Sequence, residues 1–276
     1  MTEHPTERTR DAAWDPTQYQ LFGDHRGRPF RDLLAQVLHR TPRLVVDLGC
    51  GPGDLTLTLA DRWPDARVIG VDNSPEMLER ARATDANGRV EWVEAAAEDW
   101  DPAAYDLPID ILVTNATLQW VPTHLRLIPR WLEALAPGGT FAMQVPSNFS
   151  APSHRLMRDV AFRQPRGEEL QSVLDRADAV ALPETYAALL LDRTPAVDVW
   201  ETTYQHVLPA EAEGPHPVLE WVRATGLRPV LGVLTEDEER EAFLAEYAAE
   251  LEVAYPRRDF GVLFPFSRIF AVAHVS

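Results

Sequence analysis

Cysteine is nearly missing from this chain of 276 residues, which contains one, Cys50. One cysteine cannot form an intramolecular disulfide, so the chain is not a disulfide-stabilised scaffold and we expect a reducing, cytoplasmic location. Long apolar runs are also missing, because none approaches the length that spans a membrane. Residues 1–11 are polar and lack the apolar centre of a signal peptide, which predicts a disordered tail there.

Basic residues are scarce as well. The chain has 26 Lys and Arg against 43 Asp and Glu, a formal net charge of −17. Binding to phosphate groups requires a Lys/Arg surface, so this balance argues against nucleic acid and anionic membranes as partners. A small anionic substrate would have to be bound by a local basic pocket. With 45% hydrophobic residues, residues 12–276 are predicted to form one globular domain, and we expect a monomer.

The most informative segment of the sequence is an apolar strand followed directly by a glycine-rich loop. Residues 44–53 read LVVDLGCGPG, and a segment that favours a helix starts at Asp54. Glycine permits sharp turns and close backbone approach to a ligand, so N–H groups of this loop should face a cofactor. A dinucleotide loop would read G-x-G-x-x-G. Here the third glycine comes one residue early and Asp47 precedes the first, which favours a ligand with an ammonium and a sulfonium; an ordinary strand-to-helix turn is the alternative.

This segment resembles the first motif of class I S-adenosylmethionine-dependent methyltransferases, an acid followed by x-Gly-x-Gly-x-Gly. The resemblance implies an α/β, Rossmann-like fold with a seven-stranded, mostly parallel sheet and helices on both faces. It also implies S-adenosyl-L-methionine as the cofactor and no metal. The loop residues that the resemblance assigns to the cofactor are Asp47, Gly49, Cys50, Gly51 and Gly53. Cys50 is interpreted as a small buried residue rather than a nucleophile.

A second apolar strand, residues 66–72, ends in an acid about 20 residues beyond the glycines. Asp72 is therefore the predicted ligand of the ribose hydroxyls. The alternative, that Asp72 caps the following helix, is weaker because Ser74 is better placed to cap a helix whose first residue is Pro75. Asn73 and Met77 complete the predicted cofactor contacts of this part of the chain.

A third strand, residues 90–95, leads into the segment in which this family usually has an acid for the adenine amino group. Ala96 replaces that acid here. The amino group is then left to Glu98, Asp99 or water, and the Ala97 amide is a candidate partner of a ring nitrogen. Acids that follow a strand are often simply solvated, which is the alternative for Glu98.

A fourth strand, residues 109–114, ends at Asn115, a further candidate cofactor contact, where open α/β sheets bind ligands at the carboxyl edge. Residues after it should line the methyl-transfer pocket. Gln119 can donate or accept hydrogen bonds and Trp120 offers a flat apolar wall, so together they could orient an acceptor. Alternatively, Trp120 only packs under the following helix.

The rest of the chain supplies the remaining predicted elements. Tyr19 lies in an aromatic segment that could cover the methionine end of the cofactor or anchor the N-terminus. The sequence predicts a glycine turn and fifth strand over 135–145, a helical insertion acting as a substrate lid over about 146–195, and a sixth strand over 197–208. Helices are expected over 29–39, 219–226 and 236–255, and an edge strand over 264–275.

Matched over nearly its whole length, the chain is similar to the trans-aconitate methyltransferase family. The matching segments are WDP at 14–16, LQW at 118–120, LMR at 156–158, TTY at 202–204 and ATGLRP at 224–229. The resemblance implies transfer of the methyl group to a carboxylate, giving a monomethyl ester. A carboxylate is already ionised near pH 7, so the reaction needs alignment and exclusion of water rather than a base.

A small anionic polycarboxylate needs cationic partners, and Arg binds carboxylates bidentately. The candidate substrate residues are Arg158, Tyr204, His206, Arg228 and Arg268, and the candidate catalytic residues are Gln119, Trp120, Tyr204 and Arg228. Surface ion pairing is the alternative for each arginine. Two other functions stay open: methylation of a malonyl carrier protein, which would need a basic docking patch at 163–166 and 257–258, and a non-catalytic S-adenosylmethionine-binding regulator.

Overall fold

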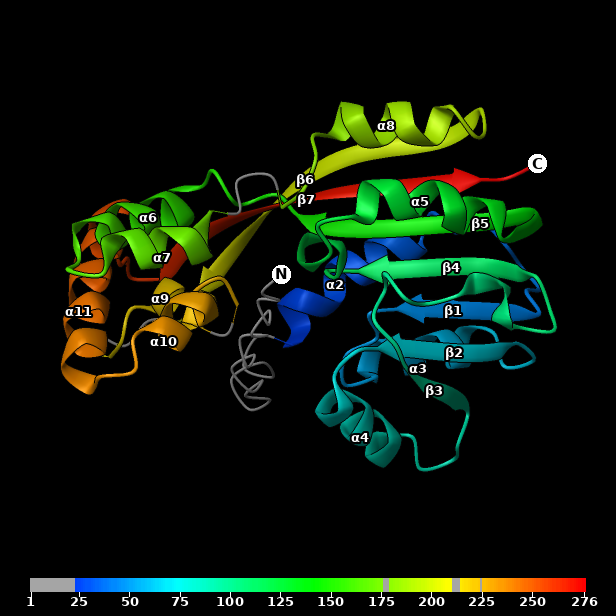
Figure 1. Cartoon of the computed structure of the whole chain (residues 1–276), viewed down its shortest axis with the longest axis horizontal. Helices are drawn as coiled ribbons and strands as arrows, with labels where there is room; N and C mark the ends of the chain where they lie inside the picture. The colour runs from blue at the N-terminus through cyan, green and yellow to red at the C-terminus, as the bar shows by residue number, and fades with distance from the viewer. Residues whose placement is uncertain (1–22, 176–178, 210–213, 224) are drawn as a thin grey trace, which may run out of the picture. The chain divides into compact units, whose positions relative to one another are not determined.

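The computed structural model describes residues 23–175, 179–209, 214–223 and 225–276. It divides into two compact units, drawn in Figure 1. Of the described residues, those at 24–147, 179–204 and 266–276 form what we call the sheet unit. Those at 148–175, 205–209, 214–223 and 225–265 form what we call the helical unit, together with Gly23. The predicted disordered tail and Tyr19 lie outside the described residues.

Seven strands of the described chain form one sheet in the order β3-β2-β1-β4-β5-β7-β6. The pairs β1·β2, β2·β3, β1·β4 and β4·β5 are parallel, whereas β5 and β7 are antiparallel. This confirms the predicted Rossmann-like, mostly parallel sheet. The strands are β1 (Leu44–Leu48), β2 (Arg67–Asp72), β3 (Val90–Glu94), β4 (Ile109–Asn115), β5 (Leu135–Pro146), β6 (Ala196–Leu208) and β7 (Val262–His274).

Apolar side chains fill both faces of the sheet. On one face Leu112 and Phe141 pack with residues of α5 (His124–Glu133) and α8 (Pro183–Leu191). On the other face the buried cluster includes residues of α2 (Gly23–Leu34) and α3 (Asp54–Arg62). Central parallel strands covered on both faces require continuous apolar sequence, which is why β1 and β4 are buried along nearly their whole length. The helix α4 (Pro75–Thr84) follows β2.

The prediction that the last strand closes the sheet at its edge is wrong. β7 lies between β5 and β6, and β6 is the edge strand. The physical reason is visible in the sequence: residues 269–273, IFAVA, have no polar residue on either face and all are buried. A strand that is apolar on both faces belongs inside a sheet rather than at its edge.

Helix boundaries also differ from those expected. The first described helix, α2, begins at Gly23 and ends at Leu34, instead of running from Pro29 to His39. Pro29 stands inside this helix, where it lacks one N–H donor. The predicted helix over 219–226 is α9 (Pro217–Arg223), and the unpredicted α10 (Arg228–Val233) follows it, because Pro229 occupies the first turn, where proline is tolerated. The long α11 (Asp237–Ala254) lies within the predicted span.

The helical unit contains α6 (Pro152–Arg163) and α7 (Gly167–Leu174), with α9, α10 and α11. Buried tyrosines tie α6 to α11, since the Tyr247 hydroxyl donates to the Ser153 carbonyl at 2.8 Å. Of the predicted insertion at about 146–195, the described residues 148–175 belong to this unit and α8 belongs to the sheet unit. Its role as a lid stays a prediction.

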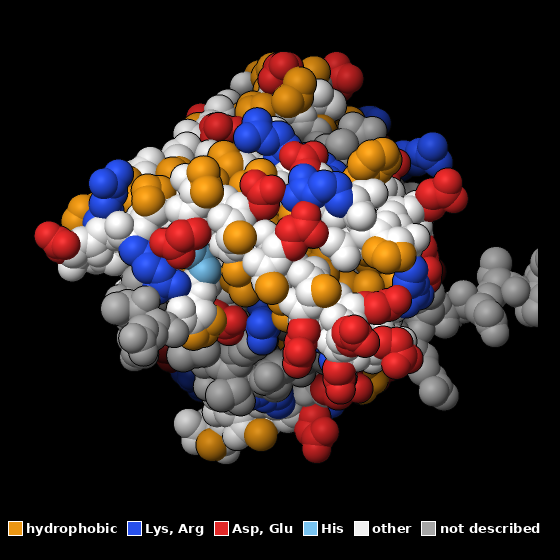
Figure 2. Space-filling view, turned by 90° about the vertical axis from the view of Figure 1, so that its left-hand side faces the viewer, with side chains coloured by type: hydrophobic (Ala, Val, Ile, Leu, Met, Phe, Trp, Pro, Cys, Tyr) orange, Lys and Arg blue, Asp and Glu red, His pale blue; other side chains and the backbone are white. Residues whose placement is uncertain are grey.

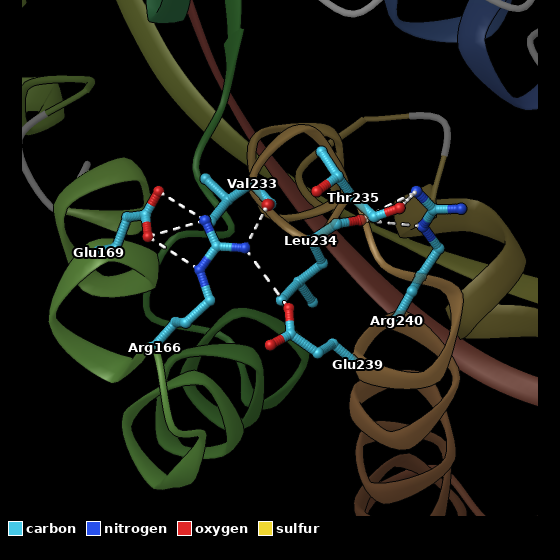
Figure 3. Close-up of polar contacts among 7 residues, drawn as sticks. All are labelled: Arg166, Glu169, Val233, Leu234, Thr235, Glu239 and Arg240. Carbon is cyan, nitrogen blue, oxygen red and sulfur yellow. Dashed lines mark hydrogen bonds and ion pairs between the residues drawn. The ribbon is translucent and has the colours of Figure 1, made fainter.

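Two arginines fix the carboxyl end of α10 (Figure 3). Arg166 donates to the Val233 carbonyl at 2.9 Å, and Arg240 donates to the Leu234 carbonyl at 2.9 and 3.1 Å. Glu169 and Glu239 bind the Arg166 guanidinium from either side. The last carbonyls of a helix have no partner within it, so these contacts satisfy groups that α10 leaves open.

Candidate active site

The glycine loop lies between β1 and α3, as predicted. Gly49, Gly51 and Gly53 have φ of 83°, 55° and 85°, a region that other residues rarely adopt. The N–H groups of Gly49 and Cys50 both donate to the Val71 carbonyl at 2.7 and 3.0 Å, which anchors the loop to β2. A Cβ added to Gly51 would meet no atom of the described residues within 4 Å, so among them open space lies over this part of the loop.

Gly49 marks the closest approach between the glycine loop and the segment after β4. A Cβ at position 49 would lie 2.0 Å from Thr117 Oγ1 and 2.3 Å from its methyl carbon. Thr117 Oγ1 also donates to the Gly49 carbonyl at 3.3 Å. Position 49 must therefore be glycine for two reasons, the positive φ and the lack of room. Sequence reasoning missed Thr117 because a lone threonine after a strand carries no distinctive signal.

Asp72 holds the loop through its carboxylate. Its Oδ2 accepts from the Gly51 N–H at 2.8 Å, and its Oδ1 accepts from the Ser74 N–H at 2.9 Å. The Ser74 hydroxyl in turn caps α4 by accepting from the Met77 N–H, so the residue that caps this helix is Ser74, as predicted, and not Asp72. Each carboxylate oxygen of Asp72 retains a second lone pair, and the predicted bond to ribose hydroxyls stays a prediction. Half-burial of Asp72 raises the pKa of its carboxyl.

Asp47 is buried at the end of β1, where the Thr56 hydroxyl of α3 donates to its Oδ2 at 2.6 Å. Burial disfavours the ionised form and raises the pKa of Asp47 to about 7, even though the bond from Thr56 acts in the opposite direction. A carboxyl group that is half-ionised near pH 7 in the free protein becomes fully ionised when a cation binds beside it. Asp47 therefore fits a ligand that carries an ammonium group.

Ligand binding at pH 6 is expected to release nearly one proton, because Asp47 is mostly protonated in the free protein at that pH and ionised in the complex. Titration of S-adenosylmethionine by calorimetry in two buffers of different ionisation enthalpy measures this release. The release should vanish at pH 8 and in Asp47→Asn. Equal heats in both buffers at pH 6 would contradict the assignment.

The sign for stability of the free protein follows from the same raised pKa. The native state binds a proton at Asp47 between pH 3.8 and about 7 that the unfolded chain does not bind. The stability contributed by this group is thus present at low pH and is lost as the pH rises through about 7. Asp47→Asn should raise the melting temperature of the ligand-free protein, and the rise should be larger at pH 8 than at pH 5.

The other predicted cofactor residues lie around the ends of β2 and β3. Met77 and Ala97 are buried, Cys50 is 7% exposed, and Asn73 and Glu98 are exposed. Burial together with the charges of Asp47 and Asp72 raises the pKa of the Cys50 thiol, which agrees with an unreactive residue. The ring of Trp92 on β3, which sequence reasoning missed, packs against the glycine loop and β2. A Cβ at Gly53 or at Gly70 would lie 2.6 Å from this ring.

A row of polar side chains crosses the carboxyl edge of the sheet. Asn115 of β4 and Gln144 of β5 are register partners, and Arg268 of β7 donates from Nη1 to Gln144 Oε1 at 3.1 Å. Gln144 is fully buried and Arg268 is 5% exposed. Within the described chain, buried Asn115 Oδ1 and Gln144 Nε2 have no hydrogen-bond partner. Gln144 escaped sequence reasoning because it is a single polar residue in the apolar strand FAMQV.

The segment after β4 carries the predicted acceptor-orienting residues on a short 3₁₀ turn, η2 (Leu118–Trp120). Gln119 is buried, and its Nε2 donates to the Ala116 carbonyl at 2.6 Å. Trp120 is 42% exposed, so it does not lie buried under the following helix. The contact of its indole with the acceptor stays a prediction.

Tyr204 differs from the other candidates of the sheet unit. Its ring is buried in the cluster that contains α2, and its hydroxyl donates to Asp32 Oδ2 at 2.7 Å. The Arg28 guanidinium lies 5.2 Å from the ring centroid. The structure thus gives Tyr204 a packing role and engages its hydroxyl, and its contact with substrate stays a prediction.

Three predicted substrate residues belong to the helical unit. Arg158 on α6 donates to the Phe149 carbonyl at 2.9 Å and is half-buried. His206 on β6 is 5% exposed and stacks on Trp221 with ring centroids 5.0 Å apart. Arg228, half-buried, is the first residue of α10. A shallow hollow of about 450 Å³ in this unit is lined by Arg158, Asp159, Phe162, Arg163 and Gln171.

A model described as a methyltransferase domain matches residues 45–139. A trans-aconitate 2-methyltransferase of Streptomyces coelicolor is 54% identical over 94% of this chain and 86% of its own length. One from Rhodococcus jostii is 50% identical over 95% and 99% of the two chains. The chain belongs to the trans-aconitate 2-methyltransferase family.

A solved structure agrees on the fold. A candidate methyltransferase of Bacillus halodurans superimposes with a TM-score of 0.54 at 15% identity, covering 90% of this chain and 98% of that one. Membership of the trans-aconitate 2-methyltransferase family makes this chain an S-adenosylmethionine-dependent methyltransferase, as the glycine loop predicted.

The site fits this cofactor. Among the described residues, the open space over Gly51, the buried carboxyl of Asp47 and Asn115 Oδ1, which has no hydrogen-bond partner there, suit a ligand with an ammonium group. Among the described residues no cluster of three or more His, Cys, Asp or Glu could hold a metal ion. No described helix combines the length and apolarity needed to cross a membrane.

Proposed function

We propose that this protein transfers the methyl group of S-adenosylmethionine to a carboxylate of trans-aconitate, giving a monomethyl ester and S-adenosylhomocysteine. The acceptor follows from relatives of that name that are 46–54% identical over about 95% of the chain. The observation in this molecule that carries the proposal is Arg268, a buried arginine bonded to Gln144 beside the end of β4. A buried guanidinium at the ligand-binding edge suits an anionic acceptor.

The chemistry asks for little beyond positioning. S-Adenosylmethionine supplies a methyl group on a sulfonium, which a carboxylate oxygen can displace without prior deprotonation. The chain's own residues then have two tasks, holding the acceptor in line with that methyl group and excluding water. Alignment of this kind lowers the barrier by about 7–11 kcal/mol, so no nucleophilic side chain or base is required.

Arg268 and Trp120 are the residues of the sheet unit that we assign to the acceptor. Arg268 binds a carboxylate, and its orientation is fixed by Gln144 and by the Phe266 ring, whose centroid is 4.7 Å from the guanidinium. Trp120 provides an apolar wall for the carbon skeleton of the acceptor. That Arg158, His206 and Arg228 of the helical unit bind the acceptor stays a prediction from their residue type.

A malonyl carrier protein is the second candidate acceptor, and the charges of the helical unit do not favour it. An acidic carrier protein needs an exposed basic patch. Arg163 forms ion pairs with Glu246 and Glu250, and Arg166 with Glu169 and Glu239. The face of the molecule drawn in Figure 2 carries acidic, basic and apolar side chains interspersed with one another. Acids thus neutralise the arginines at 163–166 that such a patch would use.

We expect the enzyme to act as a monomer in the cytoplasm. The one cysteine, Cys50, is consistent with a reducing compartment.

The proposed function is tested by incubating the protein with methyl-labelled S-adenosylmethionine and trans-aconitate, cis-aconitate, isocitrate or a malonyl carrier protein. Base-labile label on trans-aconitate in excess of the other acceptors is expected. Label on the carrier protein instead would replace the proposed acceptor. Binding of S-adenosylhomocysteine without label on any acceptor would favour the non-catalytic regulator.

A further inference from the structure

Ala116 is the one described residue other than glycine whose backbone lies in the left-handed region, with φ of 55°. An L residue with a Cβ disfavours this conformation, and it persists only where surrounding contacts impose it. Ala116 is placed between Asn115, at the end of β4, and Thr117, which contacts the glycine loop. The strained turn therefore lies where the sheet meets the cofactor loop.

Two hydrogen bonds hold this turn, one at each polar atom of the Ala116 backbone. The Ala116 N–H donates to the Gln144 carbonyl at 2.9 Å, which extends the pairing of β4 with β5 by one residue. The Ala116 carbonyl accepts from Gln119 Nε2 at 2.6 Å. Gln119 is 8% exposed, so this bond is shielded from competing water.

The turn determines where its two neighbours lie. Thr117 Oγ1 bonds the Gly49 carbonyl at 3.3 Å and fills the space that a Cβ at Gly49 would occupy. It also donates to the Asn115 carbonyl at 3.2 Å. If Ala116 relaxed to an ordinary φ, the chain direction at Thr117 would change and the glycine loop would lose this support.

We infer that Gln119 is a positioning residue of the cofactor site: its side-chain amide locks Ala116 in the left-handed turn that presses Thr117 against Gly49. This differs from the sequence prediction that Gln119 orients the methyl acceptor. The inference rests on the proposed function in one respect, that S-adenosylmethionine lies against the glycine loop.

Four proteins test the inference: the unsubstituted chain, Gln119→Met, Ala116→Gly and the double variant. Methionine is close to glutamine in size but cannot donate to the Ala116 carbonyl, and glycine adopts the left-handed conformation without a lock. Binding of S-adenosylhomocysteine is measured by calorimetry with no acceptor present. Gln119→Met should weaken binding about fivefold with Ala116 in place and less than about twofold in the Ala116→Gly background. Gln36→Met, at an exposed glutamine, is the matched control and should bind normally.

Two results would overturn the inference. One is an equal loss of S-adenosylhomocysteine binding in both backgrounds, which would show no coupling to the turn. The other is unchanged binding together with a raised KM for the acceptor, which would place Gln119 on the acceptor instead. If the unsubstituted protein bound no S-adenosylhomocysteine, the proposed function would fail. Melting temperatures would then decide the inference, because Gln119→Met should lower them more with Ala116 in place than in the Ala116→Gly background.

Discussion

Gly49→Ala is expected to abolish cofactor binding and to lower stability strongly. The added methyl group would lie 2.0 Å from Thr117 Oγ1, in a residue that must also keep φ of 83°. Overpacking costs about 1–3 kcal/mol and the left-handed conformation about 1–2 kcal/mol more, so the loop should move rather than accept both. Thermal melting should show a fall of several degrees, and calorimetry should show an affinity for S-adenosylhomocysteine at least about 100-fold weaker.

Gly51→Ala separates the loss of stability from the loss of binding, because its Cβ meets no atom within 4 Å in the part of the chain that the structure describes. It should keep most of the stability yet still weaken cofactor binding, since the methyl group enters the open space over the loop. Gly88→Ala is the matched control, with φ of 59° and equally open surroundings in the turn before β3. It should lose a similar small amount of stability and none of the affinity. Normal binding by Gly51→Ala would mean that the cofactor does not lie over Gly51.

Arg268→Met is expected to raise the KM for trans-aconitate at least about 100-fold while S-adenosylhomocysteine binds normally. Removing one member of a buried charged pair costs about 2–5 kcal/mol, and a carboxylate left without its guanidinium in this site is such a case. Steady-state kinetics at saturating S-adenosylmethionine give the KM. Arg268→Lys keeps the charge but loses the planar fork that Gln144 orients, so its KM should lie between the two.

Specificity supplies a second readout for Arg268. A dicarboxylate analogue that lacks one of the three carboxylates should be used equally well by the unsubstituted protein and Arg268→Met, provided the missing group is the one that Arg268 binds. Arg67→Met is the control. Arg67 is the first residue of β2, so it lies at the amino end of that strand, away from the carboxyl edge, and it pairs with Glu91 and Asp106. An unchanged KM for trans-aconitate in Arg268→Met would remove Arg268 from the acceptor site.

The sheet was largely predictable because local sequence specifies each of its parallel strands. β1 and β4 are short apolar runs bounded by glycine, proline or polar residues, and the glycines after β1 need a conformation that only glycine takes readily. The position of β7 was predicted wrongly, since adjacency along the chain says nothing about insertion between earlier strands. α10 was missed because Gly226 was interpreted as the end of a helix and no new helix was predicted after it, although Pro229 occupies the first turn of one.

The site was less predictable than the fold, because its supports are pairs that are distant in sequence or backbone conformations that propensity disfavours. Asp47 and Asp72 could be identified from the motif, but the bond between Asp47 and Thr56 depends on how α3 packs on β1. Gln144 and Arg268 meet only because β7 runs antiparallel to β5. Alanine is a poor residue for a left-handed turn, so nothing in the sequence indicates Ala116.

The place of β7 in the sheet also determines when the sheet can be completed during synthesis on the ribosome. Every other strand is synthesised before β7, yet β6 joins the sheet only through β7. Until Val262–His274 leaves the exit tunnel, the nascent chain carries an open β5 edge with unpaired N–H and C=O groups and an apolar surface on both faces. Translational pausing before Val262 should therefore prolong an aggregation-prone intermediate, and chaperones that bind apolar strands would act during that interval.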